Sequence, residues 1–251
     1  MTDWALELAE NANTYGPLGP TDERIVTDRF VLWMGRGDQP GWNVAQRFRI
    51  RAEEVETLRE EIHEILRERG RTVCSWEVGT HATPPDLVER LLALGLVDDD
   101  PDPLAIGMVL RHEPLAPPPD VEVRRALTRD ELIAAERIAR EAFGDGVGEI
   151  NPSPPVEDKP IYLALIDGEP VARASASYSE HGVSLFGGAT LPDARGRGAY
   201  RALVAARWRD AVERGTPLLV TQAGRMSRPI LSRLGFEELC EIRILVDRFG
   251  A

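Results

Sequence analysis

The sequence predicts an α/β (α+β) protein: a mixed central sheet with flanking helices, preceded by a truncated half-domain of similar design. Three observations lead to this prediction. In residues 119–251, apolar runs of strand length alternate with amphipathic segments of helix length. The same strand–helix–strand–helix–strand order occurs in residues 42–110. A proline-rich segment at 114–119 stiffly separates the two stretches.

Composition and charge narrow the class of protein. The chain has 251 residues, of which 43% are hydrophobic and 29% charged, as in soluble globular proteins. The net charge of −12 argues against a nucleic-acid partner, because phosphate backbones need a basic face. Residues 1–118 hold 22 acidic and 12 basic residues, against 20 and 18 in residues 119–251. This asymmetry supports a domain boundary at residue 118.

Several absences in the sequence favour a cytoplasmic protein with no membrane partner. No apolar run approaches the ~18–20 residues of a membrane span. Residues 1–10 are acidic and amphipathic, unlike a secretory signal. Cys74 and Cys240 each lie in an apolar run, and we expect buried free thiols in a reducing compartment. We expect no metal site.

In the first half, each element follows from periodicity and from turn residues. Residues 24–34 and 42–50 are expected to form strands, after a short helix and a Gly/Pro break within residues 1–20. Apolar residues spaced by three and four predict a helix over 53–69, which Gly70 ends. Strand 71–78, helix 83–94 and strand 104–110 follow.

In the second half, a strand at 121–127 precedes Thr128 and Glu131, whose spacing predicts a capping box and a helix to Phe143. The proline- and glycine-rich stretch 144–160 is expected to form a substrate lid or wall. Strands are predicted at 161–166, 170–178 and 183–191, the first two joined by a tight turn at Asp167 and Gly168. After the next helix, a strand at 217–222, a helix at 226–234 and a strand at 238–246 complete the chain.

Between strand 183–191 and its helix lies a short loop that carries Arg195, Gly196, Arg197 and Gly198. The glycines allow the backbone to approach a ligand closely and to adopt unusual dihedral angles. The amides that follow point out of a helix N-terminus, where the helix dipole favours an anion. The loop is therefore suited to hold a phosphate or pyrophosphate.

This order of elements, with the arginine–glycine loop after the fourth strand and Gly235-Phe236 after the last helix, resembles the GNAT superfamily of acyl-CoA-dependent N-acyltransferases. The resemblance covers residues 119–250 and implies a GNAT fold that uses acetyl-CoA as cosubstrate. The repeated order in the first half resembles a degenerate GNAT copy, which gives domains at 1–118 and 119–251. At residues 51–54 that copy has Arg-Ala-Glu-Glu and no glycine. We therefore expect it not to bind CoA but to complete the sheet or wall the acceptor pocket.

The resemblance also implies which residues bind CoA. The pyrophosphate-binding loop maps to Arg195, Gly196, Arg197, Gly198, Ala199 and Tyr200. Tyr200 stands where glycine or alanine is usual, so its side chain must point away from the phosphates. The strand segment that pairs with the pantetheine arm maps to Ala189, Thr190 and Leu191, with the family's bulge at 187–188.

Catalytic residues are left unassigned by the sequence. The resemblance implies a tyrosine as general acid on the last helix, but Leu231 occupies that position. Ser227 is a weak candidate to contact the thiol, with a capping or packed hydroxyl as the alternative. Tyr178 and Glu180, beside His181, are weak candidates to deprotonate an amine through water, with an exposed hairpin end as the alternative.

The resemblance implies an acetyl-CoA-dependent N-acetyltransferase that moves an acetyl group directly to the amine of a small molecule in a ternary complex. The alternative is a CoA- or acyl-CoA-binding sensor or interaction module with little transferase activity. Acetylation of proteins is less expected, because it needs an open groove that the half-domain and the 144–160 loop would restrict. A homodimer is left open.

Overall fold

A computed structural model describes residues 2–144, 150–154 and 156–250. The chain folds into two compact units. Unit 1 contains Met1–Met108, Gln222–Pro229 and Glu238–Ala251, and unit 2 contains Val109–Thr221 and Ile230–Glu237. This division differs from a single boundary at residue 118, because two C-terminal segments belong with the N-terminal residues.

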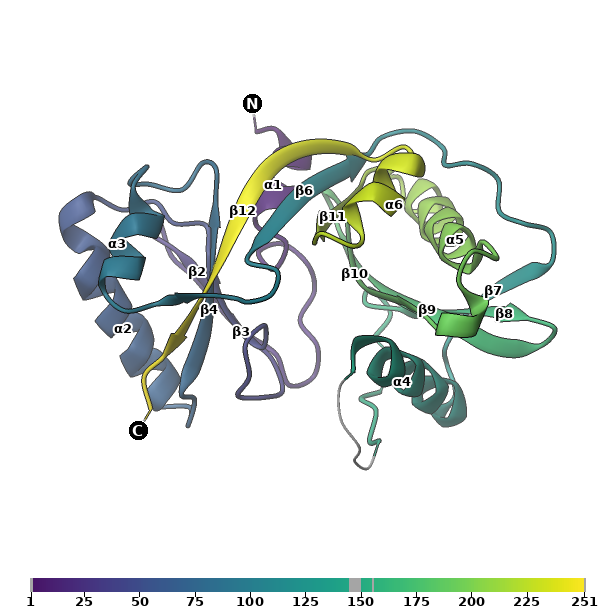
Figure 1. Cartoon of the computed structure of the whole chain (residues 1–251), viewed down its shortest axis with the longest axis horizontal. Helices are drawn as coiled ribbons and strands as arrows, with labels where there is room; N and C mark the ends of the chain where they lie inside the picture. Colours follow the sequence, from purple (N-terminus) through teal and green to yellow (C-terminus); the bar gives the residue numbers. More distant parts are fainter. Residues whose placement is uncertain (1, 145–149, 155, 251) are drawn as a thin grey trace. The chain divides into compact units, whose positions relative to one another are not determined.

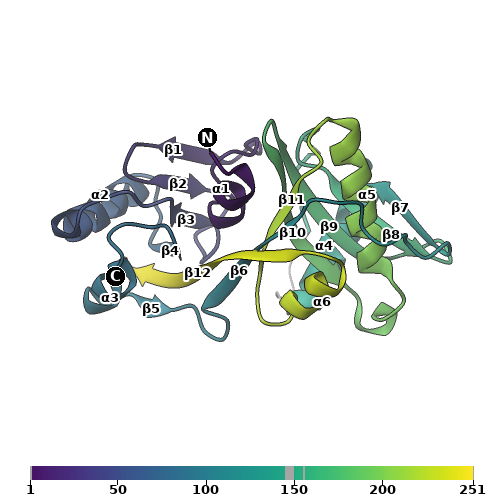
Figure 2. The ribbon, with the colours of Figure 1, turned by 90° about the horizontal axis from the view of Figure 1, so that it is seen from above.

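Unit 1 is a sheet with the strand order β1-β2-β3-β4-β12-β6, in which β5 pairs with β12. β3 and β4 run parallel, whereas the β1–β2, β2–β3 and β4–β12 pairs are antiparallel. α2 and α3 lie on one face of this sheet and α1 on the other (Figures 1 and 2). The elements are α1 (Trp4–Glu10), β1 (Glu23–Val26), β2 (Val31–Met34), β3 (Asn43–Gln46), η1 (Ala52–Glu54), α2 (Val55–Arg67), β4 (Val73–Gly79), α3 (Leu87–Ala93), β5 (Val97–Asp98), β6 (Leu104–Leu110) and β12 (Glu237–Arg248).

The core of unit 1 lies between the sheet and the α2–α3 layer. Alternate residues of each strand face it, as the two-residue period of a strand requires. Trp76 of β4 is fully buried there and stacks on Phe48 with ring centroids 5.0 Å apart. Cys74 is a buried free thiol whose pKa is raised by burial, and Cys240 is likewise buried with a pKa of about 12. Both thiols are therefore protonated packing groups, as the sequence predicts.

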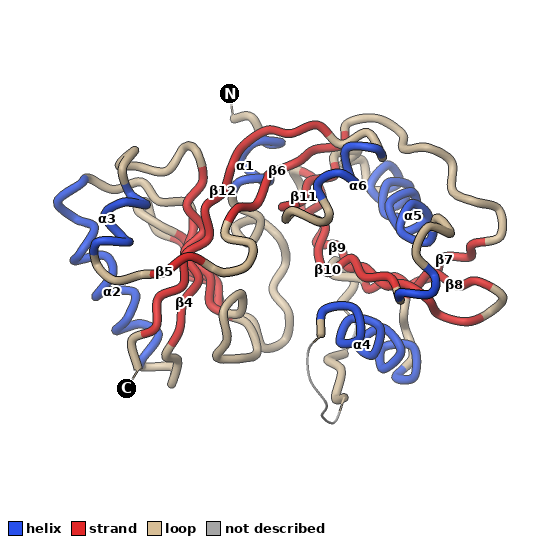
Figure 3. Tube along the Cα trace, viewed as in Figure 1, coloured by secondary structure: helices blue, strands red, loops and turns tan. Residues whose placement is uncertain are grey.

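Unit 2 is a sheet with the strand order β11-β10-β9-β8-β7. All neighbours are antiparallel except β10 and β11, which run parallel. α4 covers one face and α5 the other (Figures 1 and 3). The elements are β7 (Val121–Arg125), α4 (Arg129–Phe143), β8 (Ile161–Ile166), β9 (Glu169–Ser179), β10 (Gly182–Thr190), η2 (Pro192–Ala194), α5 (Ala199–Glu213), β11 (Leu219–Ala223) and α6 (Arg228–Arg233). This mixed sheet with helices on both faces confirms the predicted fold class.

Local turn chemistry in unit 2 follows the sequence closely. Thr128 accepts a hydrogen bond from the Glu131 amide, and the Glu131 carboxylate accepts one from the Thr128 amide, so the predicted capping box of α4 is confirmed. Asp167 and Gly168 both have positive φ, as a two-residue hairpin turn of this type requires. No helix among the described residues is long and apolar enough to cross a membrane.

Candidate functional site

The parallel strands β10 and β11 pair only at their beginnings. The paired residues are Val183 with Leu219 and Ser184 with Val220. The Thr221 hydroxyl then donates to the Leu185 carbonyl at 3.1 Å, while β10 continues to Thr190. The later part of β10 therefore presents a backbone edge that β11 does not pair with along the described register. Such an edge can bond to an extended ligand in the manner of an added strand.

A β-bulge interrupts β10 at the predicted position. The register with β9 shifts between Phe186 and Ala189, and Gly187 has a φ of 53°. The Arg173 guanidinium donates to the Gly187 carbonyl at 2.8 Å and holds the bulge in place. The predicted bulge at 187–188 is therefore confirmed, and it re-aims the end of β10.

Beyond the bulge, the backbone of the predicted pantetheine segment alternates in direction. The Leu191 amide donates to the Val171 carbonyl at 2.9 Å, so Leu191 and Ala189 face β9. The peptide groups of Thr190 point the other way, toward the open edge. The Ala189 side chain is buried against α4, and Leu191 packs beside it. Among these three residues, Thr190 therefore offers the accessible amide.

The loop that follows ends in free amides at the N-terminus of α5. Gly198 immediately precedes the helix with a φ of 83°, and the first bond of the helix runs from the Ala202 amide to the Gly198 carbonyl. Within the described chain, the four amides from residue 198 to residue 201 donate to no acceptor. Gly196 also has a positive φ, 79°. The left-handed glycines thus leave consecutive N–H groups free where the helix dipole favours an anion.

Side chains around the loop add charge without filling it. Arg195 and Arg197 are exposed; Arg197 lies 3.5 Å from the Asp167 carboxylate, and Arg195 makes no ion pair with any described residue. The Tyr200 ring lies against Gly188, where an added Cβ would be 2.5 Å from its Cε2 atom. The ring is therefore directed toward β10, and the Tyr200 amide is free.

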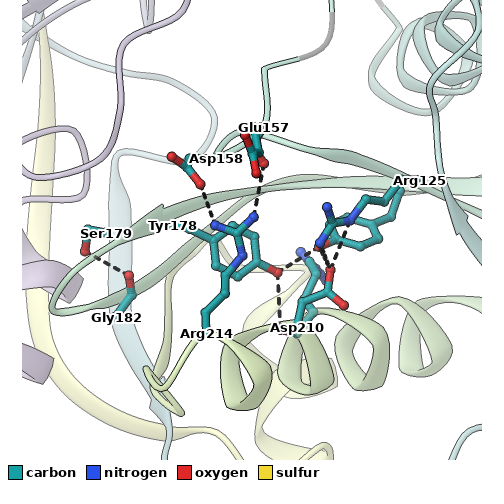
Figure 4. Close-up of polar contacts among 10 residues, drawn as sticks. Arg125, Glu157, Asp158, Tyr178, Ser179, Gly182, Asp210 and Arg214 are labelled. Atoms are coloured by element: carbon teal, nitrogen blue, oxygen red, sulfur yellow. Dashed lines mark hydrogen bonds and ion pairs between the residues drawn. The ribbon is translucent and has the colours of Figure 1, made fainter.

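Tyr178 belongs to a buried network on the α5 face of the sheet (Figure 4). Its hydroxyl lies 2.7 Å from that of Tyr162, which donates to Asp210 of α5 at 2.5 Å. Arg125 of β7 also donates to Asp210, at 2.6 Å. Burial raises the pKa of Tyr178, and the Arg214 guanidinium covers its ring at 4.3 Å. These contacts make Tyr178 a structural link between α5 and the sheet.

The structure does not bring the other predicted catalytic candidates together with Tyr178. The Glu180 side chain is 85% exposed at the β9–β10 turn, where it lies 3.4 Å from His181. The Ser227 hydroxyl donates to the Gly224 carbonyl at 3.2 Å, as a local cap would. Leu231 of α6 is buried.

The equivalent loop in unit 1 is occupied by the protein itself. Between β3 and α2, the Arg51 amide donates to the Glu54 carboxylate at 2.9 Å. The Arg51 side chain makes ion pairs with Glu54 at 3.0 Å and Glu53 at 3.3 Å. These carboxylates place negative charge in the loop before α2, and that charge opposes an anion there.

Two further expectations concern features outside this loop. In the predicted lid at 144–160, residues 145–149 and 155 lie outside the described residues. Across the part of the chain that the structure describes, no group of three or more His, Cys, Asp and Glu side chains could hold a metal ion.

The sequence and the fold can be compared with those of known proteins. No protein-family model matches the sequence, and no curated protein matches it at the sequence level. Among solved structures, a GCN5-related N-acetyltransferase from Kribbella flavida has a TM-score of 0.68 at 24% identity, covering 92% of this chain and 91% of that one. A conserved protein of unknown function from Staphylococcus epidermidis has a TM-score of 0.67 at 12% identity, with 91% and 94% covered. A tandem GNAT protein from the clavulanic acid biosynthesis pathway has a TM-score of 0.60 at 15% identity, with 99% and 94% covered.

Proposed function

Starting from a chain that has the fold of the GNAT N-acetyltransferases, we propose an acetyl-CoA-dependent N-acetyltransferase. The acceptor is the amine of a small molecule, and the acetyl group moves directly to it in a ternary complex. The observation that carries this proposal is the run of free amides at the N-terminus of α5 beside the open edge of β10. A pyrophosphate fits the amides, and an extended amide-bearing arm fits the edge.

The residues of unit 2 divide these tasks in a simple way. Gly198, Ala199 and Tyr200 donate their amides to the pyrophosphate, and Arg195 and Arg197 add positive charge beside it. Thr190 presents a backbone amide on the open edge, where it can donate to the oxyanion that develops on the thioester carbonyl. Holding donor and acceptor side by side supplies much of the rate enhancement through proximity.

The second candidate function is a CoA-binding module with little transferase activity. It is favoured by Leu231, a buried aliphatic residue at the position where the family resemblance implies a general acid. A chain that retains the anion-binding loop but lacks the acid could bind CoA as a sensor or partner.

A thiol-release assay separates the two candidates. The full chain is mixed with acetyl-CoA and a panel of small primary amines, and free CoA thiol is followed with a thiol-reactive dye. Amine-dependent release supports the transferase, and an acetylated amine detected by mass spectrometry completes the test. Binding of acetyl-CoA with no turnover on any amine would support the module.

The loop itself is best tested through its arginines rather than its glycines. A β-branched residue at Gly198 is expected to abolish acetyl-CoA binding. However, an added Cβ there would also overlap Pro118, and the backbone has a φ of 83°. Loss of binding in such a variant could therefore come from a displaced loop, whereas Arg195 and Arg197 are exposed and can be changed without that effect.

A further inference from the structure

Unit 1 contains a group of polar side chains on the sheet face that α1 covers. We call this group the α1-side cluster. Its members come from α1 and the residues after it, from β3, from β4 and from β11: Glu10, Asn11, Thr14, Gln46, Glu77 and Gln222. Four of these residues are buried and two are partly buried, and polar groups inside a fold need hydrogen-bond partners.

The strand register places Gln46 beside Glu77. β3 and β4 pair in parallel at Ala45 and Trp76, whose side chains point into the core on the α2 side. Because successive residues point to opposite faces, Gln46 and Glu77 are adjacent on the α1 side. Gln222 joins them, since its amide nitrogen lies 3.3 Å from Glu77 Oε2 and 3.2 Å from the Glu10 carbonyl.

Two amide side chains of the cluster are buried with half of their hydrogen-bonding capacity unused. Gln46 is fully buried and donates to the Thr14 hydroxyl at 2.7 Å, but its Oε1 has no partner in the described structure. Asn11, which is 2% exposed, likewise has an unpartnered Nδ2. The Thr14 amide donates to the Asn11 carbonyl, which keeps both amides in the same group. An unpartnered buried polar group destabilises a fold, so each of these two atoms is open to a hydrogen bond with a ligand.

The cluster also contains a carboxylate with no cation. None of the described Arg, Lys or His side chains makes an ion pair with Glu77, and burial raises its pKa to about 7. The neighbouring Glu10 carboxylate is buried over Gly79, accepts from the His81 amide at 2.6 Å and lies 3.4 Å from the His81 ring. Elsewhere in unit 1, the buried Asp247 carboxylate contacts both Arg59 and His63. Glu77, which is partly buried, therefore lacks the positive charge that carboxylates removed from water normally require.

We propose that the α1-side cluster binds a small primary amine that also carries a hydroxyl or carbonyl oxygen. Glu77 and Gln46 Oε1 accept hydrogen bonds from the ammonium group, and Asn11 Nδ2 donates to the ligand oxygen. This inference goes beyond the proposed function, because it concerns residues of unit 1 alone. Binding here can fail while acetyl-CoA still binds and turns over, so the two proposals can be told apart.

The test is a titration of the 15N-labelled full chain followed by NMR. Ethanolamine is the probe, and the side-chain amide signals of Gln46 and Gln222 are monitored. Ethylene glycol lacks the ammonium group and n-propylamine lacks the hydroxyl. We expect saturable shifts with ethanolamine, weaker binding of n-propylamine and no saturable shift with ethylene glycol. This comparison uses the unmodified chain, so it tests amine binding at the α1-side cluster without any variant.

Glu77→Gln then tests the carboxylate directly, with Glu64→Gln as the matched control. Glu64 is an exposed residue of α2 in the same unit. We expect at least tenfold weaker ethanolamine binding for Glu77→Gln and unchanged binding for Glu64→Gln, since an ion pair that excludes water is worth at least one factor of ten. A folded Glu77→Gln chain that binds ethanolamine as the unmodified chain does would overturn the proposal. So would an unmodified chain whose Gln46 and Gln222 signals do not respond to either amine.

Discussion

The two units contain the same β-α-β crossing with different loops. In unit 1, α2 joins β3 to β4, and in unit 2, α5 joins β10 to β11. Both strand pairs are parallel, and both are paired over only two residues. The loops before the helices differ. Residues 51–54 form a 3-10 turn closed by Arg51 and Glu54, whereas residues 195–198 hold two left-handed glycines and leave amides free.

This difference shows that the crossing alone does not set the chemistry of the loop before the helix. The topology brings a helix N-terminus to the end of a strand in both units. In unit 1 a glutamate of the same turn already satisfies an amide, and its negative charge opposes an anion. In unit 2 the glycines provide the same position with neither a carboxylate nor a Cβ. A few turn residues on a shared scaffold therefore give the two loops different charge and different hydrogen-bonding groups.

The crossover helices are also anchored by opposite arrangements of charge. In unit 1, Arg59 and His63 of α2 contact Asp247 of β12 at 2.9 and 2.7 Å. In unit 2, Asp210 of α5 receives hydrogen bonds from Arg125 and Tyr162 of the sheet. The carboxylate is on the strand in one case and on the helix in the other. Both anchors are polar groups inside apolar surroundings, where one missing partner is costly.

The largest expected effect comes from breaking the anchor of unit 1. Asp247→Ala would leave Arg59 and the buried His63 without their shared carboxylate. We expect the free energy of unfolding, measured by urea titration, to fall by about 3–5 kcal/mol. Asp28→Ala is the control, because Asp28 is exposed; it should change stability by less than about 0.5 kcal/mol. Equal effects of the two substitutions would show that the contacts of Asp247 with Arg59 and His63 do not stabilise β12.

The contacts of Asp247 also predict how the stability of the chain changes at low pH. Burial alone would raise the pKa of Asp247, but hydrogen bonds from His63 and Arg59 outweigh it and hold the pKa below its usual value. Its stabilising contribution is therefore present above the ordinary aspartate pKa and is lost as the pH falls through the lower folded-state value. The stability difference between the unmodified chain and Asp247→Ala should narrow in acid.

The second effect tests the loop of unit 2. Arg195→Glu combined with Arg197→Glu places two negative charges beside the free amides. We expect acetyl-CoA to bind about 30- to 150-fold more weakly by calorimetry at fixed salt, on the order of 2–3 kcal/mol. Arg209→Glu is the matched control, an exposed arginine on the same α5 helix. Unchanged affinity in the double variant would remove the loop from the proposed CoA site.

The sequence was sufficient for features that depend on neighbouring residues. The α4 capping box, the turn at Asp167 and Gly168 and the glycine conformations of the loop were predictable, because each rests on local backbone chemistry. The bulge at 187–188 was implied by the family resemblance and is present. The GNAT fold followed from the order of these elements. The CoA-binding assignments of individual residues stay predictions.

Features that depend on distant residues were not predictable. β12 pairs with β4, and Asp247 meets His63 across 184 positions of sequence. No periodicity in residues 238–246 indicates that partner. Tyr178 is similar, because its position near Glu180 in sequence suggested a shared cluster. Glu180, however, lies beyond the end of β9 in the exposed turn to β10, and the fold instead joins Tyr178 to Tyr162 and Asp210.

A third, smaller effect concerns pH and the α1-side cluster of unit 1. The raised pKa of Glu77, about 7, means that the folded state keeps the proton that the unfolded state has lost. The contribution of Glu77 to the free energy of unfolding is thus fully present below the ordinary glutamate pKa. It declines as the pH rises toward about 7. We expect the free energy of unfolding of Glu77→Gln not to decline over this pH range. At pH 8 it should exceed that of the unmodified chain by about 1–3 kcal/mol. Parallel stability curves for the two chains from pH 5 to 8 would contradict this.

The smallest expected effect is at the loop of unit 1, and it completes the comparison. The Arg51 side chain is 72% exposed, so its ion pairs with Glu53 and Glu54 are screened by water. If residues 51–54 do not bind CoA, Arg51→Glu should leave the affinity for acetyl-CoA within about a factor of two of the unmodified chain. The substitution is the same charge reversal that is predicted to be damaging at Arg195 and Arg197. A loss of affinity comparable to theirs would mean that the two crossings share the anion-binding role, despite the missing glycines.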